Sequence, residues 1–310
     1  MSGDGAMELP DSIKNLGEQV EAGGEITPAA ELFDAYPVFA AEVAQLFTRP
    51  WLAVDHVSRL AGDGDYFRAE VGSRSIVLVR EAPDRIHALR NACLHAGYRV
   101  CEEESGRSDH LFCQYHGWSY ALDGRLTDPL LRPELTDRSR FRLPHYAMRV
   151  ERGLILVDLS ALAPEPPKPG PVDLGAVPEA LAEANVTSRK RYPTAWNWKY
   201  LRQWLWAAPE LAFGGDECGD VTEIGPLSFV ALRGDEAALV RLCPRFPGHT
   251  DVEIVRLAVP DASPPAANGA DPIEEAIRRH GDAIAAAPLD VLDRRFYEWY
   301  WPLLQPALAS

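Results

Sequence analysis

Two Cys–His pairs are the residues of this sequence best suited to chemistry. Cys93 and His95 stand in Cys-Leu-His, and Cys113 and His116 stand in Cys-Gln-Tyr-His, with 17 residues (96–112) between the pairs. Two thiolates and two imidazoles suit a mixed-ligand [2Fe–2S] cluster, in which the cysteines bind one iron and the histidines bind the other. Because neutral imidazole replaces anionic thiolate, such a cluster accepts an electron more readily than an all-cysteine cluster. The four residues therefore predict a chain that handles electrons.

A structural zinc site is the alternative, because zinc also binds cysteine and histidine. Zinc sites of that kind usually pair Cys-x-x-Cys with His-x-His or a second Cys-x-x-Cys, which is not the spacing here. Gly97 and Gly117 follow the two pairs. Glycine lets backbone amides approach the cluster sulfurs closely, so these flanks favour an iron–sulfur cluster.

Residues 79–157 resemble the Rieske domain of ring-hydroxylating oxygenase α subunits, the Rieske non-haem iron oxygenases. The resemblance rests on Asn-Ala-Cys-Leu-His-Ala-Gly at 91–97 and Cys-Gln-Tyr-His-Gly-Trp at 113–118. It implies that Cys93, His95, Cys113 and His116 hold a Rieske [2Fe–2S] cluster.

This sequence departs from the family in small ways. The family usually has Arg or Lys where Ala96 stands and Pro where Gln114 stands. Respiratory-type Rieske proteins add a disulfide between the two cluster loops, at the positions that Tyr98 and Tyr115 occupy here. The resemblance therefore favours the oxygenase and ferredoxin branch, which has a lower potential.

The composition is that of an acidic globular protein. The 310 residues are 46% hydrophobic and 25% charged, and the net charge is −15. This charge argues against binding nucleic acid or anionic membranes, because both require a basic face. We see no apolar run of membrane-span length and no signal peptide at Met1. Two of the five cysteines are assigned to the cluster, which leaves an odd number, so we do not expect a disulfide framework. Because free thiols are usual in the cytoplasm, we expect a cytoplasmic location.

We expect four segments and an α+β fold: an all-β Rieske domain followed by a helix-grip (Bet v 1/START-like) α+β domain. The segments are a loose N-terminal arm at 1–36, the Rieske domain at 37–162, a Pro-rich linker at 163–171 and a degenerate oxygenase catalytic-type domain at 172–310. The linker is assigned because Pro at the density of Ala-Pro-Glu-Pro-Pro-Lys-Pro-Gly-Pro favours an extended spacer.

Apolar patterning predicts the elements of both domains. In the first, a short helix is expected at 37–47, strands at 75–80, 86–92 and 154–159, and a hairpin around Asp123-Gly124. In the second, strands are expected at 227–232, 238–242 and 252–259, and helices at 273–287 and 289–304. The segment Asn197-Trp198-Lys199 and the final helix also resemble the catalytic domain of the family.

The mononuclear iron site of the family is not recognisable. Family members follow Asn-Trp-Lys with Glu-Asn, a bridging acid and two histidines, which with a distant carboxylate make a two-His-one-carboxylate site. Aligned from Lys199, the corresponding positions here are Gln203 and Trp204, then Ala207, then Glu210, and finally residues 213–215. The sequence contains no histidine between His145 and His249. We therefore expect the catalytic iron to be absent from this chain.

A relocated iron site is the alternative, and Glu210, Asp216, Glu217 and His249 are the residues that would form it. The tryptophans of residues 196–206 and three arginines each allow a functional and a purely structural interpretation. The tryptophans at 196, 198, 204 and 206 line a substrate pocket or, more commonly for such a cluster, fill a core. Arg90, Arg99 and Arg107 form a basic rim for an acidic ferredoxin or simply lie on the surface.

Three functions follow from the resemblance. The leading hypothesis is an α-like subunit that accepts electrons from a reductase or ferredoxin and passes them, through His95 or His116, to the mononuclear iron of a catalytic α-type partner. The family forms rings, so a hetero-oligomer, a trimer or hexamer, is expected. The second is a self-sufficient mono- or dioxygenase with relocated iron ligands that hydroxylates or demethylates a small organic substrate. The third is a non-catalytic assembly subunit.

Overall fold

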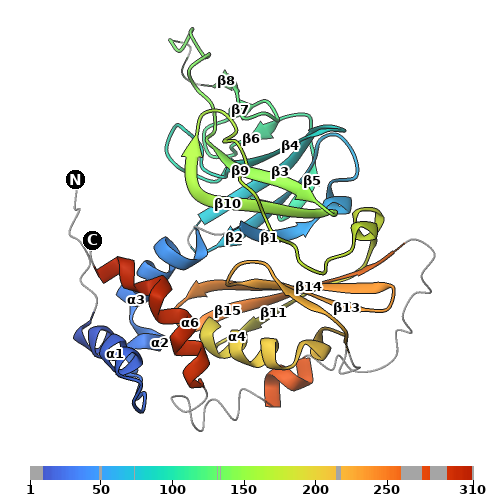
Figure 1. The fold of residues 1–310 in the computed structure, drawn as a ribbon. Helices are drawn as coiled ribbons and strands as arrows, with labels where there is room; N and C mark the ends of the chain where they lie inside the picture. The colour runs from blue at the N-terminus through green and yellow to red at the C-terminus, as the bar shows by residue number, and fades with distance from the viewer. Residues whose placement is uncertain are drawn as a thin grey trace.

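The computed structural model of the chain describes residues 10–48, 51–72, 74–130, 132, 134–213, 218–259, 274–279 and 292–308. Two β-rich layers lie one above the other in Figure 1, with helices grouped at one end near both termini. The fold is α+β, as the sequence predicts. None of the helices in the described part of the chain combines the length and the apolar composition that a membrane crossing requires.

The upper layer is built on a seven-stranded antiparallel sheet of order β1-β10-β9-β4-β3-β2-β5. Its strands are β1 (Trp51–His56), β2 (Asp65–Val71), β3 (Arg74–Ala82), β4 (Arg85–Arg90), β5 (Ser105–Arg107), β9 (His145–Glu151) and β10 (Leu154–Ala163). The strands predicted at 75–80, 86–92 and 154–159 are confirmed as β3, β4 and β10.

The apolar run of β3 is continuous because both faces of this strand are buried. Ile76 and Leu78 join the largest apolar core, which extends into the lower layer. Val77 and Val79 point the other way and join a smaller core around Cys93 and Cys113. One strand thus connects the body of the protein to the two cysteine loops.

A three-stranded sheet carries the second cysteine loop. It consists of β6 (Leu111–Phe112), β7 (Trp118–Tyr120) and β8 (Leu126–Pro129), in that order. The turn between β7 and β8 contains Asp123-Gly124, and Gly124 has a φ of 86°, which glycine adopts without strain. The hairpin predicted there is confirmed.

The lower layer is a five-stranded antiparallel sheet of order β11-β15-β14-β13-β12. The strands are β11 (Asn185–Thr194), β12 (Val221–Glu223), β13 (Ser228–Arg233), β14 (Glu236–Phe246) and β15 (His249–Ala258). The three predicted strands are confirmed as β13, β14 and β15. The sequence did not reveal β11, because this edge strand carries Arg189, Lys190 and Arg191 in place of an apolar alternation.

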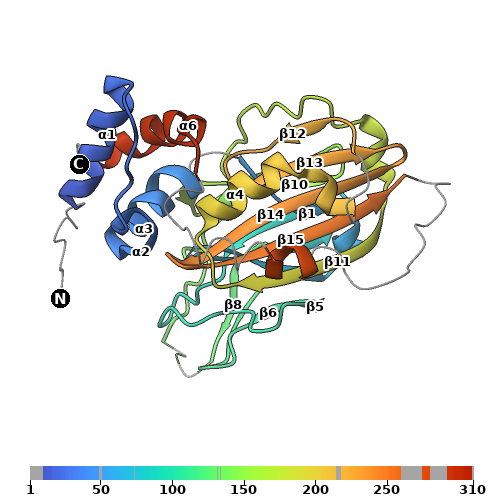
Figure 2. The same cartoon turned by 90° about the horizontal axis from the view of Figure 1, so that it is seen from below.

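Each face of the lower sheet packs against a different partner. Helix α4 (Trp198–Ala207) crosses one face, as Figure 2 shows. On the other face, Val230, Leu239 and Val255 share an apolar core with Leu154 and Leu156 of β10. The two layers therefore meet sheet against sheet.

The N-terminal segment corrects one prediction. Residues 11–34 are not a loose arm: they form α1 (Asp11–Ala22) and α2 (Glu31–Asp34), and residues 1–9 lie outside the described part. Helix α1 buries Ile13 and Leu16, and its Gly17 lies so close to Trp301 that an added Cβ would be 2.0 Å from the indole ring. The packing partner is α6 (Arg294–Leu304), almost 300 residues away in the chain, so local patterning did not reveal it.

The structure describes the remaining predicted helices only in part. The helix predicted at 37–47 is confirmed as α3 (Tyr36–Glu42) followed by a π-helical turn (Val43–Phe47). Residues 294–304 of the helix predicted at 289–304 are confirmed as α6, which Asp293 caps, and residues 289–291 lie outside the described part. Residues 274–279 of the helix predicted at 273–287 are helical, and the rest of that prediction lies outside the described residues.

The Pro-rich segment follows β10 and has no regular structure, although it is fixed to the upper layer. The Pro171 carbonyl accepts a hydrogen bond from Trp51 Nε1 (2.9 Å), and the Gly170 carbonyl accepts one from Arg149 (3.0 Å). The assignment of domain boundaries on either side of 163–171 remains a prediction.

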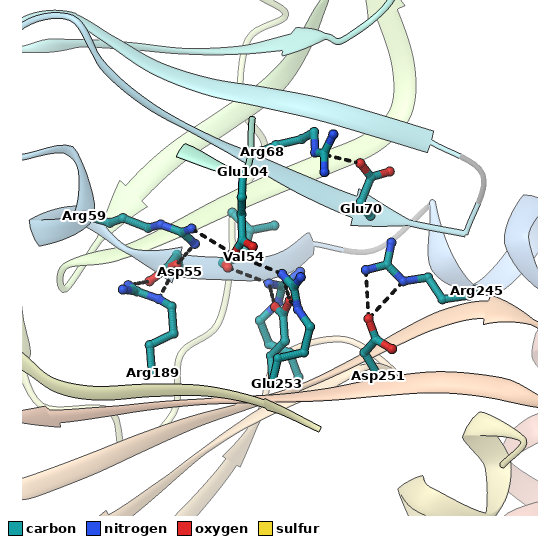
Figure 3. Close-up of polar contacts among 12 residues, drawn as sticks. Val54, Asp55, Arg59, Arg68, Glu70, Glu104, Arg189, Arg245, Asp251 and Glu253 are labelled. Carbon is teal, nitrogen blue, oxygen red and sulfur yellow. Dashed lines mark hydrogen bonds and ion pairs between the residues drawn. The ribbon is translucent and has the colours of Figure 1, made fainter. Parts of the chain in front are cut away.

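Buried charges join the two layers, as Figure 3 shows. The Asp55 carboxylate on β1 is 2% exposed, and it accepts hydrogen bonds from Arg59 (2.7 Å) of the upper layer and from Arg189 (2.6 and 3.2 Å) on β11. Such charge-assisted, bidentate contacts are strong and directional.

A second group of charges lies beside the first. Arg241 on β14 donates to the Val54 carbonyl on β1 (2.8 Å) and to Glu253 (2.5 Å), and Arg191 also pairs with Glu253 (2.7 Å). Burial opposes ionisation of Glu253, but Arg241 and Arg191 outweigh it and hold the pKa of this carboxyl below its usual value. Both layers thus contribute to one charge network.

Asp55→Asn is expected to lower the free energy of unfolding by about 3 kcal/mol, because it leaves two guanidinium groups at a buried junction without their carboxylate. Asp251→Asn is the matched control. Among the residues that the structure describes, the ion-pair partner of Asp251 is Arg245 (2.9 Å), which is 28% exposed, so a loss under about 1 kcal/mol is expected. Urea denaturation of the two variants measures the difference, and equal losses would show that the Asp55 junction has no special weight.

Candidate iron–sulfur site

The two cysteine loops have matching backbone hydrogen bonds. In the first, the Cys93 amide donates to the Tyr98 carbonyl (2.7 Å) and the Gly97 amide donates to the Cys93 carbonyl (2.8 Å). In the second, the Cys113 amide donates to the Trp118 carbonyl and the Gly117 amide to the Cys113 carbonyl, both at 2.9 Å. Each loop is therefore closed on itself by two backbone bonds before any side chain is considered.

Glycine is required at the same place in each loop. Gly97 has a φ of 75° and Gly117 a φ of 74°, in the left-handed region where other L-residues are strained by about 1–2 kcal/mol. The sequence singled out both glycines as flanks of the Cys–His pairs. Their conformation gives the local reason for their position.

The loops bring the four candidate ligands together as two pairs. His95 Nδ1 and His116 Nδ1 face each other at 3.0 Å. Cys93 and Cys113 are both buried, and their thiols are in hydrogen-bond contact. No group of three or more His, Cys, Asp or Glu side chains converges on one point among the residues the structure describes. Two separate pairs are what a cluster of two irons requires, since the thiolates bind one iron and the imidazoles the other.

Neighbouring polar groups suit thiolate sulfur. Burial raises the pKa of Cys113, whereas the backbone amides of Tyr115 and His116 donate to its sulfur and favour the thiolate. The Tyr120 hydroxyl lies 3.1 Å from Cys93 Sγ and accepts a hydrogen bond from the Leu94 amide (3.0 Å). Its own hydrogen is therefore free to point at the sulfur. The donor set fits a [2Fe–2S] cluster.

Sequence reasoning missed the roles of two aromatic residues. Burial raises the pKa of Tyr120, so it stays a neutral donor beside Cys93. The Trp118 ring stacks on the His95 ring, with centroids 5.0 Å apart and planes 8° apart. Both residues are visible in Gly-Trp-Ser-Tyr at 117–120, but only the pairing of β7 with β6 turns them toward the first loop.

The histidine edge of the site is partly open to solvent and is surrounded by apolar side chains. Tyr98 (48% exposed) and Tyr115 (55% exposed) stack with ring centroids 3.7 Å apart, and Tyr115 also contacts the His116 ring. The two tyrosines occupy the positions of the respiratory-type disulfide. Leu94, which directly precedes His95, is also exposed, and we call Tyr98, Tyr115 and Leu94 the aromatic collar.

In the lower layer, the positions aligned with the family's iron ligands make other contacts. Gln203 accepts a hydrogen bond from the Asp293 amide (3.0 Å), and Ala207 is exposed at the end of α4. Trp204 packs against Trp196 with ring centroids 6.1 Å apart. Phe213 is buried under the guanidinium of Arg233.

Glu210 and His249, the two candidate relocated ligands that the structure describes, lie far apart. Glu210 lies in a short 3₁₀ turn (Pro209–Phe213), and the Ala212 carbonyl of that turn accepts a hydrogen bond from Arg256 (2.8 Å). Arg256 lies on β15, and His249 begins this strand seven residues before Arg256. At about 3.3 Å per residue, Arg256 and His249 are about 23 Å apart, so Glu210 and His249 lie near opposite ends of β15. Asp216 and Glu217 lie outside the described residues.

The tryptophan-rich segment fills a core, as one of the two interpretations held. Trp198 is fully buried and donates from Nε1 to Glu42 (2.8 Å). Arg202 lies over the rings of Trp206 (4.6 Å) and Trp299 (3.9 Å). These contacts hold α4 in place between the lower sheet and α6.

Comparison with known proteins identifies the upper layer. Residues 50–141 match the family of the Rieske [2Fe-2S] domain. The N,N-dimethyl phenylurea N-demethylase subunit alpha of Sphingobium sp. (strain YBL2) is 37% identical over 114 residues, 36% of this chain and 25% of that protein. The glycine betaine monooxygenase oxygenase subunit of Chromohalobacter salexigens is 39% identical over 89 residues, 29% of this chain and 20% of that protein. The similar segment thus spans a quarter or less of these relatives.

Solved structures extend the likeness in fold to the whole chain. The apo form of the quaternary ammonium Rieske monooxygenase CntA superposes with a TM-score of 0.59 at 15% identity, covering 98% of this chain and 89% of that one. Naphthalene 1,2-dioxygenase from Rhodococcus sp. gives a TM-score of 0.60 at 15% identity, covering 99% and 87%. Residues 50–141 therefore belong to the Rieske [2Fe-2S] domain family, and the chain as a whole shares the fold of solved Rieske oxygenases.

Proposed function

We propose that Cys93, His95, Cys113 and His116 hold a Rieske [2Fe–2S] cluster, and that the chain is an α-type subunit that relays electrons. The electrons would come from a reductase or ferredoxin and would go to the mononuclear iron of a partner α subunit, where substrate is oxidised. The observation that carries the proposal is the pair of imidazole nitrogens, 3.0 Å apart at a partly exposed edge, above a buried pair of thiols.

A bound cluster would supply one-electron chemistry, with a potential raised by its two neutral ligands. The protein residues supply the environment. The closed loops fix the ligands, and the amides at 115 and 116 and the Tyr120 hydroxyl direct hydrogen bonds at sulfur. The exposed histidine edge leaves a short path from the site to a second protein.

The absence of a mononuclear iron from this chain is part of the proposal. Imidazole is the usual anchor of such iron, and the sequence has no histidine from residue 146 to residue 248. The aligned positions on α4 and the turn after it are instead engaged in packing with Asp293, Trp196 and Arg233. Substrate oxidation would therefore require another subunit.

The aromatic collar supports delivery to a partner. Exposed Tyr98, Tyr115 and Leu94 lie next to the histidine pair of an acidic protein. Aromatic residues are enriched in the cores of protein interfaces, where they bury large areas at a small cost in side-chain entropy. A catalytic α-type subunit docked on the collar would place its iron next to His95 or His116.

Metal analysis of the purified chain tests the proposal. We expect about two irons and two sulfides per chain, no turnover by the chain alone, and turnover when a related α subunit with an intact iron site is added. Cys113→Ser is expected to lose the cluster absorption. Cys101→Ser is the matched control in the same domain, because burial raises the pKa of Cys101 to about 12 and keeps it a neutral thiol outside the two pairs. A third iron together with activity of the isolated chain would contradict the division of labour.

Tyr120→Phe is expected to lower the midpoint potential of the cluster, because it removes a hydrogen bond to Cys93 Sγ that stabilises the more negative, reduced state. Tyr146→Phe removes a buried hydroxyl that contacts Arg74 instead, and it should leave the potential unchanged. Redox titration followed by electron paramagnetic resonance compares the two variants. Metal analysis checks that the two variants contain the same amount of iron. Equal midpoint potentials would argue against a hydrogen bond between Tyr120 and the Cys93 sulfur.

A further inference from the structure

Beside the first cysteine loop lies a basic pocket with a volume of about 360 Å³. Three arginines line it: Arg74 on β3, Arg90 at the end of β4, and Arg99 just after the loop. Gly97 and Tyr146 also line it. We call this site the arginine pocket.

The pocket has more positive than negative charge. Arg99 pairs with Glu70 (3.5 Å), a carboxylate that is 12% exposed and that also pairs with Arg68 (3.2 Å). Within the described part of the chain, neither Arg74 nor Arg90 has a carboxylate at ion-pair distance. Two guanidinium groups therefore face the pocket without a counter-charge, in a chain whose net charge is −15.

The pocket is also partly preorganised. Arg74 donates to the Leu159 carbonyl (2.7 Å) and to the Tyr146 hydroxyl, and Tyr146 is 2% exposed. The Arg74 guanidinium is therefore held in place by the sheet, while Arg90 is exposed and free to close on a ligand. A fixed donor beside an adaptable one suits bidentate recognition of a carboxylate.

The position of the pocket indicates the kind of ligand. Gly97 belongs to both the pocket wall and the first cysteine loop, and no atom lies within 4 Å of a Cβ built on it, so this stretch of backbone is open to contact. The next residue, Tyr98, belongs to the aromatic collar. A carboxylate in the arginine pocket would therefore sit on a protein that also covers the edge of the candidate cluster.

We propose that the arginine pocket receives a carboxylate side chain of an acidic electron-donor protein and so docks the donor beside the cluster. The proposal rests on the proposed electron-relay function. The net charge of −15 repels an acidic donor elsewhere, so the pocket would select both the place and the orientation of docking. Complementary charge of this kind raises association rates and makes binding sensitive to salt.

Binding of a plant-type [2Fe–2S] ferredoxin with an acidic surface, oxidised and measured from an ionic strength of about 0.1 M upward, where charges are screened over about 10 Å, tests the pocket by calorimetry. Arg90→Glu is expected to weaken the affinity at least about tenfold and to flatten its dependence on salt. Arg85→Glu is the matched control. Arg85 begins the same strand that Arg90 ends, and it is 65% exposed and lies 3.7 Å from Glu81. This control should change the affinity less than about twofold, because its charge lies far from the pocket.

Equal weakening by Arg90→Glu and Arg85→Glu, or no effect of either, would overturn the docking site. A second result would also overturn it: phosphate stabilises the wild-type chain but not Arg90→Glu, while both chains bind ferredoxin with the same affinity. That result would indicate a pocket for a free anion. Reduced methyl viologen, a cation, separates this proposal from the function on which it rests. If it fails to reduce the cluster of the wild-type chain, the electron relay is wrong, and the affinities still decide whether the pocket docks an acidic protein.

Discussion

The pairing of buried carboxylates with arginines from both layers is the interaction on which the rest of the structure depends. Asp55 belongs to β1, an edge strand of the upper sheet, yet a guanidinium from the lower sheet, Arg189, satisfies it. Arg241 extends the same junction by donating to the β1 backbone at Val54. Buried ions are tolerated only when each has its partners, so the two sheets have few alternative ways to meet. The domain with the cysteine loops is thereby held in one orientation on its support.

From that junction, order extends to the site through β3. Its two faces belong to two apolar cores, one shared with the lower layer and one with the cysteine loops. Close packing transmits position, because side chains in a dense interior cannot shift independently. The loops add rigidity of their own through paired backbone bonds and a left-handed glycine in each. The sheet and the two loops together therefore fix the positions of the two thiols and the two imidazoles.

Different surfaces of the upper domain carry different kinds of side chain. Charges compensate one another at the layer junction, whereas the arginine pocket and the aromatic collar adjoin each other through Gly97 and Tyr98, next to the histidine edge. The proposed electron relay would require a donor and an acceptor to bind near one cofactor, and neither to bind permanently. A half-exposed apolar collar beside a small basic pocket gives two kinds of contact within a short distance of the imidazoles.

The sequence by itself determined the features that depend on local spacing: the four candidate ligands, the two glycines, the Asp123-Gly124 hairpin, the apolar strands and the lack of histidine in α4. Local hydrogen bonds and side-chain alternation fix these, so neighbours in the chain suffice to predict them. Only the tertiary structure decided that α1 packs on α6 through Gly17 and Trp301, that Tyr120 meets Cys93, and that Arg74, Arg90 and Arg99 share a pocket. It also placed Glu210 and His249 near opposite ends of a strand. These relations join residues far apart in sequence, and strand order and helix packing, which no local pattern encodes, set the distances between them.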